Sequence, residues 1–98
     1  MIRPVIIRPE ADADVSETRD WYGERLEGLG LKFASRVALA IERIGEAPEL
    51  YGEVAPGVRA APVRRHRHVV FYRILPDRVD VLAVLHGARD AAEWKRRI

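Results

Sequence analysis

The chain lacks cysteine, has only two serines and contains no long apolar run. Without cysteine it can form neither a disulfide nor a thiolate nucleophile. Ser16 and Ser35 lie in segments with a helical pattern and have no base in recognisable register, so neither indicates a serine nucleophile. No apolar run approaches the roughly 20 residues of a membrane-spanning helix, and the N-terminal segment lacks the apolar region of a signal peptide. We therefore expect a cytoplasmic protein with no membrane partner.

Acidic residues are scarce in the second half of the chain, where positive charge accumulates. Residues 1–53 contain seven Lys or Arg and eleven Asp or Glu, a net charge of −4, whereas residues 54–98 contain ten and four, a net charge of +6. No acid occurs from 54 to 76, and all cations except Lys32 and Lys95 are arginine. Because guanidinium forks match phosphate and carboxylate groups, this half predicts a nucleic-acid or acidic-peptide partner.

The first half of the chain predicts a strand and two helices. Residues 2–8 are β-branched, and Pro4 places this strand at a sheet edge because proline cannot donate a ladder hydrogen bond. Pro9 and the acids after it suit the start of a helix. Glycines at 28 and 30 separate that helix from a second one, which ends before Pro48, so the two should form an antiparallel hairpin. The expected buried faces are Ala11, Val15, Thr18, Tyr22 and Leu26, then Phe33, Val37, Ala40, Ile41 and Ile44.

The second half predicts three strands and a short helix. Residues 58–64, 68–75 and 78–86 have an extended pattern, and the last is apolar on both faces, with Val79, Val81, Ala83 and Leu85 opposite Leu82 and Val84. Asp90 is expected to cap a helix over 91–97. At 98 residues with 48% hydrophobic content, residues 1–98 should form one domain. The predicted class is α+β: a helical hairpin on one face of a small, mostly antiparallel sheet, with Arg-rich strands on a partly open second face.

Several short motifs follow one another in a fixed order along the chain. They are Ala11 with Asp14, the pair Trp21–Tyr22, Gly30 with Phe33, Ile44 with Pro48 and Tyr51, the pair Val58–Arg59, and residues 68–73 and 84–89. In this order and spacing the whole chain resembles toxins of the RelE/ParE superfamily of type II toxin–antitoxin modules. The resemblance implies a stable toxin that a labile antitoxin holds inactive. RelE-like members cleave mRNA in the ribosomal A site, whereas ParE-like members inhibit DNA gyrase and are not nucleases.

A nuclease would need particular side chains. Metal-free RNA cleavage requires a base, an acid and cations around the phosphate. The sequence offers Glu53 or His86 for proton transfer and, for charge, Arg65, Arg67 and Arg73. The family's nucleases tend to carry an aromatic or basic group after the last strand, where this chain has glycine and alanine at 87 and 88. His86 has the alternative of bonding to backbone at a strand end, and Arg73 of pairing with Asp80.

Other cations and aromatics are candidates for binding an antitoxin or a target. Arg59, Arg64, Arg65 and Arg67 could do so, or they could protect strand edges from aggregation. The C-terminal candidates for a target surface are Arg89, Trp94, Arg96 and Arg97. Trp21 lies off the apolar stripe of its helix, as an exposed anchor or as a packed ring. Trp94 has the same two alternatives: it docks the last helix or is exposed for a partner.

No metal or cofactor is expected. His66 and His68 would face the same side of a strand, but without cysteine or a nearby acid they make a poor metal site. The glycines are scattered and form no phosphate-cradling loop.

The preferred interpretation is a ParE-like toxin of the plasmid-stabilisation type. It would inhibit DNA gyrase by binding, and a ParD-like antitoxin with an acidic or amphipathic segment would neutralise it across the hairpin and sheet. The alternatives are a RelE-like, ribosome-dependent mRNA endonuclease and a non-toxic binding module on the same fold.

Overall fold

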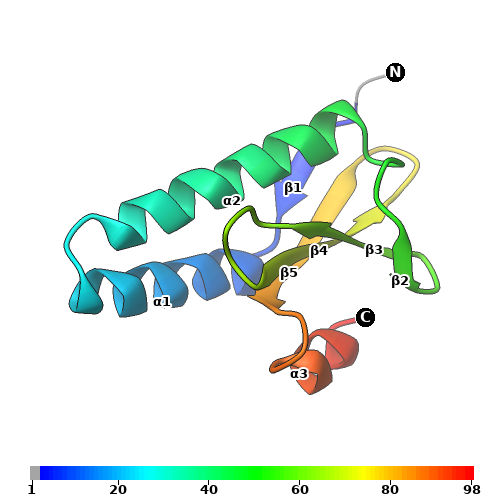
Figure 1. Ribbon diagram of the computed structural model, residues 1–98. Coiled ribbons are helices and arrows are strands. Elements are labelled where there is room, and N and C mark those ends of the chain that lie inside the picture. Colours follow the sequence, from blue (N-terminus) through cyan, green and yellow to red (C-terminus); the bar gives the residue numbers. More distant parts are fainter. Residues whose placement is uncertain (1–2) are drawn as a thin grey trace.

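The computed structural model describes residues 3–98, in which a helical hairpin lies on one face of a mixed five-stranded sheet (Figure 1). The predicted α+β class and the order of its main elements are confirmed. Ile2, the first residue of the predicted N-terminal strand, lies outside the described residues. The elements are β1 (Val5–Ile7), α1 (Pro9–Arg25), α2 (Leu29–Glu46), β2 (Glu53–Ala55), β3 (Val58–Pro62), β4 (His68–Ile74), β5 (Val79–His86) and α3 (Ala91–Arg96).

The strand order in the sheet is β1-β5-β4-β3-β2. β1 lies at an edge, as Pro4 predicts, and pairs parallel with β5, whereas the other neighbours are antiparallel. β2 was not predicted from the sequence, because its three residues are too few to show the two-residue alternation of a strand. Its signal was Pro56–Gly57: Gly57 has a φ of 74°, which allows the tight turn from β2 into β3.

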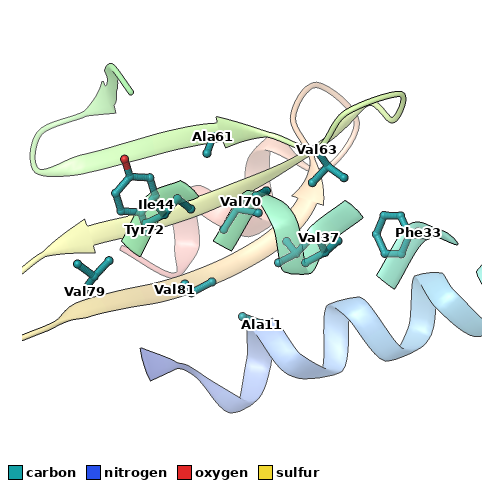
Figure 2. Close-up of a cluster of buried hydrophobic side chains, with 12 residues drawn as sticks. Ala11, Phe33, Val37, Ile44, Ala61, Val63, Val70, Tyr72, Val79 and Val81 are labelled. Atoms are coloured by element: carbon teal, nitrogen blue, oxygen red, sulfur yellow. The ribbon is translucent and has the colours of Figure 1, made fainter. Parts of the chain in front are cut away.

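The larger core lies between the hairpin and the sheet, where Figure 2 shows α2 side chains meeting those of the strands. The face of α2 predicted to be buried is buried at Phe33, Val37, Ala40 and Ile44. Tyr72 of β4 is fully buried among them, and its hydroxyl donates to the Pro48 carbonyl. Burial raises the pKa of Tyr72 to about 12. The expectation for Leu26 is wrong: α1 ends at Arg25, and the Leu26 side chain is exposed.

A β-bulge changes which face of the sheet the β5 side chains occupy. The register between β4 and β5 pairs Tyr72 with Val81 but Phe71 with Ala83, so Leu82 is the extra residue. The two predicted faces of this strand are therefore wrong beyond Val81. Val84 packs with Val79 and Val81 under the hairpin, and Ala83 joins Leu82 on the other face.

α3 covers part of that other face, and Ala60, Val69 and Leu85 remain only partly buried there, so the sheet is partly open as expected. Trp94 of α3 is buried and stacks on Phe71 of β4, with ring centroids 4.6 Å apart and an interplanar angle of 16°. Its indole N–H donates to the Gly87 carbonyl at 3.4 Å. The arginines predicted on the strands of this face lie largely elsewhere, because Arg64, Arg65 and Arg67 belong to the loop between β3 and β4.

Asp90 precedes α3 at its N-cap position but does not cap the helix through its side chain. Its carboxylate accepts the N–H of His86 at 3.0 Å and bonds from the Arg89 guanidinium. The Asp90 N–H in turn donates to the His86 carbonyl at 3.0 Å. The predicted cap is wrong because this reciprocal turn already uses the carboxylate to hold the end of β5.

Candidate functional site

A pocket of about 460 Å³ lies where α1 meets the β3–β4 loop and the end of β5. It gathers all three histidines of the chain, three arginines and two aromatic side chains of α1. Its lining residues are Glu17, Thr18, Trp21, Tyr22, Arg65, His66, Arg67, His68, His86 and Arg89. The antiparallel register of β4 and β5 creates this grouping because it places His68 directly opposite His86.

His66 lies between Tyr22 and Arg36, and these neighbours fix its tautomer. The Arg36 Nη1 lies 3.0 Å from His66 Nε2, and the Tyr22 hydroxyl lies 3.1 Å from Nδ1. Because a guanidinium can only donate, we assign Nε2 as the acceptor and place the ring proton on Nδ1, which donates to the Tyr22 oxygen. Burial and the nearby Arg36 both lower the pKa of His66, which favours this neutral ring. The Tyr22 hydroxyl proton is then free to donate into the pocket.

His68 forms the deepest part of the pocket wall and is only 7% exposed. Its ring packs edge-on against Phe33, with centroids 5.0 Å apart, and its Nδ1 is buried without a hydrogen-bond partner in the part of the chain described. Burial is the main cause that lowers the pKa of His68, and Arg89 adds to it. A buried polar atom without a hydrogen-bond partner is uncommon in folded proteins.

His86, the predicted candidate for catalysis, has the backbone role that the sequence analysis kept as its alternative. Its Nδ1 accepts the N–H of Arg89 at 3.0 Å. Since Nδ1 is an acceptor, a neutral His86 ring carries its proton on Nε2.

Of the predicted cations, three contribute to the pocket. Arg65 and Arg67 line it from the β3–β4 loop and form no ion pair within residues 3–98, whereas Arg89 pairs with Asp90 at 3.2 Å. Arg65 has a φ of 64°, so the loop holds this residue in a left-handed conformation that is uncommon for a side chain of its size. Arg64 does not line this pocket. It lies beside a second hollow, of about 200 Å³, with Arg36, Leu39, Arg43 and Arg65.

Glu53 and Arg59, two of the predicted site residues, lie apart from the pocket. Glu53 pairs in register with Arg59, which lies opposite Tyr72. Tyr72 is four residues along β4 from His68, about 13 Å at the rise of a strand, so Glu53 cannot exchange protons with His86. Arg59 instead donates to the carbonyl of Tyr51 at 2.7 Å and to that of Glu49 at 3.3 Å, which gives it a structural role.

The alternative in which Arg73 forms an ion pair with Asp80 is wrong. The two residues are opposite each other in the β4–β5 register, but Asp80 is bound by Arg8 at 3.0 Å and by Arg78 at 2.9 Å. Burial alone would raise the pKa of Asp80, yet these two guanidinium groups lower it. Two closer arginines therefore take the carboxylate that the sequence analysis assigned to Arg73.

The structure divides the remaining aromatic and C-terminal candidates into exposed and internal residues. Trp21 is 50% exposed at the pocket rim, and the Arg25 guanidinium carbon lies 3.4 Å from its ring centroid. Trp94 docks α3 on the sheet, so its exposed alternative is wrong. Arg97 is bound internally by Asp14 and Glu93. Arg96, the other predicted candidate in α3, is exposed and pairs with Glu93, so it could still contact a target.

Part of this site was not predicted from the sequence. Tyr22 packs against the core as expected but also lines the pocket, and His66 and His68 were weighed only as metal ligands. Among residues 3–98, no cluster of three or more His, Asp or Glu side chains could hold a metal ion. The sequence did contain a signal for the pocket. Thr18 and Tyr22 are the polar members of the α1 stripe that was expected to be buried, and both line the pocket beside the β3–β4 loop. The resulting arrangement is rich in donors and suited to binding an anion.

Comparison with known proteins finds a matching protein family and a similar solved structure. A model of the family described as "ParE toxin of type II toxin-antitoxin system, parDE" matches residues 5–91. A similar solved structure is that of the chromosomal ParDE TA system from P. aeruginosa, with 17% sequence identity and a TM-score of 0.79, covering 87% of this chain and 96% of that one. Among curated proteins, no sequence matches. None of the helices in the described part is long and apolar enough to cross a membrane.

Proposed function

Because the chain belongs to the ParE toxin family of type II toxin–antitoxin systems, we propose that it inhibits DNA gyrase and that a cognate ParD-like antitoxin neutralises it. The proposed mechanism is binding without chemistry on the DNA by this protein. In the cytoplasm, the toxin stabilises a complex of gyrase with cleaved DNA, and replication stops.

The observation that carries the proposal, beyond the family, is the arrangement of the titratable groups. Glu17 is the one carboxylate that lines the pocket, and within residues 3–98 no hydrogen bond joins it to a histidine. Glu53 lies at the other end of the sheet, and His86 Nδ1 is occupied by a backbone N–H. The two predicted proton-transfer groups, Glu53 and His86, therefore cannot act together as an acid–base pair, which favours a binding function over RNA cleavage.

The antitoxin part of the proposal is supported by the surface of the hairpin. Leu31 and Leu39 are exposed on α2, and Leu39 borders the second hollow beside the guanidinium groups of Arg36, Arg43 and Arg64. Apolar side chains flanked by cations suit an amphipathic segment with carboxylates on its polar side. This is the kind of antitoxin segment that the sequence analysis expects.

One observation favours the alternative, a ribosome-dependent mRNA endonuclease. The pocket does bring His86 together with Arg65 and Arg67, as that alternative requires. A nuclease of this kind would use the Arg side chains on the phosphate and the histidines for proton transfer, without a metal.

Paired assays on purified, antitoxin-free protein test the proposal. In one, the protein is incubated with gyrase, ATP and supercoiled plasmid, and trapped cleavage complexes are counted. In the other, it is incubated with programmed ribosomes, and mRNA ends are mapped. Trapped gyrase without mRNA cuts supports the proposal, whereas A-site cuts without an effect on gyrase overturn it. Inactivity in both assays, with folding confirmed, would favour the non-toxic binding module.

A further inference from the structure

The pocket between α1, the β3–β4 loop and the end of β5 has an excess of positive charge. Arg65, Arg67 and Arg89 line it, and Arg36 lies directly behind His66. Two carboxylates oppose these four guanidinium groups: Glu17 in the lining and Asp90, which pairs with Arg89. With neutral histidines these six charged groups sum to +2, opposite in sign and close in magnitude to the charge of about −1.5 to −2 that a phosphate monoester has near neutral pH.

The hydrogen-bonding groups around the pocket are mostly donors. The guanidinium groups cannot accept, and the tautomer of His66 leaves the Tyr22 hydroxyl proton free to donate. The donors come from three separate elements and surround one space, so a ligand with several acceptor oxygens could satisfy them together. A phosphate monoester has three such oxygens, whereas a carboxylate has two.

The pocket is larger than a phosphate group alone needs. Its volume of about 460 Å³ falls in the range of about 300–1,000 Å³ that is usual for small-molecule sites. Trp21 lies at its rim with half of its surface exposed, and Thr18 also lines the pocket. The Arg25 guanidinium lies over one face of this indole, so a nucleobase would stack on the exposed surface that remains.

We propose that this pocket binds a mononucleotide, with its phosphate monoester on Arg65, Arg67 and Arg89 and its base against Trp21. The site depends on neither gyrase nor the ribosome, so it can exist whichever target the toxin has. Tyr22 donates its hydroxyl proton to a phosphate oxygen, and His66 holds that hydroxyl in place. Occupation of the pocket would change the surface where α1 meets the β3–β4 loop.

Titration with defined small molecules tests the site. The probes are adenosine 5′-monophosphate, ribose 5-phosphate, inorganic phosphate and adenosine, each followed by Trp fluorescence and by NMR of the imidazole signals. All three histidines line the pocket, so their signals report on it directly. The proposal expects the nucleotide to shift these signals at the lowest concentration, ribose 5-phosphate to bind more weakly, and adenosine to leave them unchanged. It is overturned if adenosine binds as well as the nucleotide, or if the nucleotide leaves the histidine signals unchanged.

A matched pair of loop variants separates a specific site from general attraction to positive charge. Arg67→Ala removes a pocket guanidinium, and Arg64→Ala removes the same charge three residues away, outside this pocket. Arg67→Ala should weaken binding of adenosine 5′-monophosphate by about tenfold, the scale of one charged hydrogen bond, and Arg64→Ala by less than about twofold. Equal losses in the two variants, at unchanged melting temperatures, would overturn the proposal.

Discussion

Arg97, one residue from the end of the chain, forms a two-pronged ion pair with Asp14 of α1, with Nη1–Oδ2 at 2.7 Å and Nη2–Oδ1 at 3.0 Å. This ion pair lies at one edge of the sheet and bonds to the backbone of β5. β1 ends at Ile7, so β5 has no neighbouring strand beyond this point on that side. Asp14 accepts the Val84 N–H at 2.9 Å, and Arg97 donates to the Leu82 carbonyl at 3.4 Å. Two side chains thus satisfy backbone groups that a longer β1 would have bonded.

Replacement of Asp14 should therefore destabilise the fold. Asp14→Ala leaves the Val84 N–H without a partner and leaves Glu93 as the remaining carboxylate on Arg97, so the free energy of unfolding should fall by about 1–3 kcal/mol. Asp14→Asn keeps an oxygen for the Val84 N–H and should lose less. Urea denaturation measures both, and a loss below about 1 kcal/mol for Asp14→Ala would contradict this role.

Trp94→Ala should also destabilise the fold, by about 3–5 kcal/mol, because it removes a buried indole stacked on Phe71. Arg96→Ala, a change of an exposed residue in the same helix, should alter stability by less than about 0.5 kcal/mol. Thermal melting distinguishes the two. If Trp94→Ala keeps full stability, the indole is not the anchor of α3. A deletion of the C-terminal helix would remove this anchor, so target contacts are better tested with Arg89 and Arg96.

His86→Ala should leave gyrase inhibition intact. The variant loses the Arg89 N–H bond to the ring, a cost of about 0.5–1.5 kcal/mol, and gains no clash. Growth inhibition and trapped gyrase complexes are the measurements, with circular dichroism to verify folding. Complete loss of toxicity in a folded variant would instead favour the mRNA endonuclease.

The second hollow should contribute to antitoxin binding. The double variant Arg43→Ala with Arg64→Ala removes two guanidinium groups beside Leu39 and should weaken the antitoxin complex by up to about tenfold at low salt. Its affinity should also depend less steeply on salt. Calorimetry of antitoxin binding at two salt concentrations checks this, with Arg96→Ala as a control on another helix. Equal effects in the control would mean that total charge, rather than this hollow, matters.

The histidine cluster predicts a loss of stability in mild acid. Burial lowers the pKa of both His66 and His68 below the ordinary value of 6.5, with Arg36 and Arg89 as the next causes. As pH falls through about 6.5, the unfolded chain therefore binds more protons than the folded chain, and the free energy of unfolding decreases. Above that pH the full stability is present. Bonds from Arg89 and Arg97 lower the pKa values of Asp90 and Glu93, respectively, and that stability is lost only in stronger acid.

Denaturation measured between pH 7.5 and 5.5 therefore reports on the histidines, because Asp90 and Glu93 bind protons only in stronger acid. His68→Phe should flatten this dependence and cost little at pH 7.5, because the native Nδ1 has no partner within the described residues. An unchanged pH profile in His68→Phe would show that His68 does not contribute to it.

Local patterns predicted the hairpin well, because the face of α2 repeats with the helical period over Phe33, Val37, Ala40 and Ile44. They did not predict β2, which is too short to have a period, nor the bulge at Leu82, which depends on how β4 pairs with β5. The pocket also depends on the pairing of β4 with β5. His68 and His86 are 18 positions apart in the chain, and only the antiparallel register makes them neighbours.

The sequence by itself determined which chemistry is impossible here, the thiolate and disulfide chemistry of cysteine, and where the arginines are concentrated. It also determined the types of most elements, because helical and extended periods arise from nearby residues. Only the tertiary structure decided which arginines are available to a partner. Arg59 and Arg97 are bound internally, and Arg65 and Arg67 face a pocket. The physical reason is that a charge is neutralised by groups close in space, and Asp14 lies 83 residues before the arginine it holds.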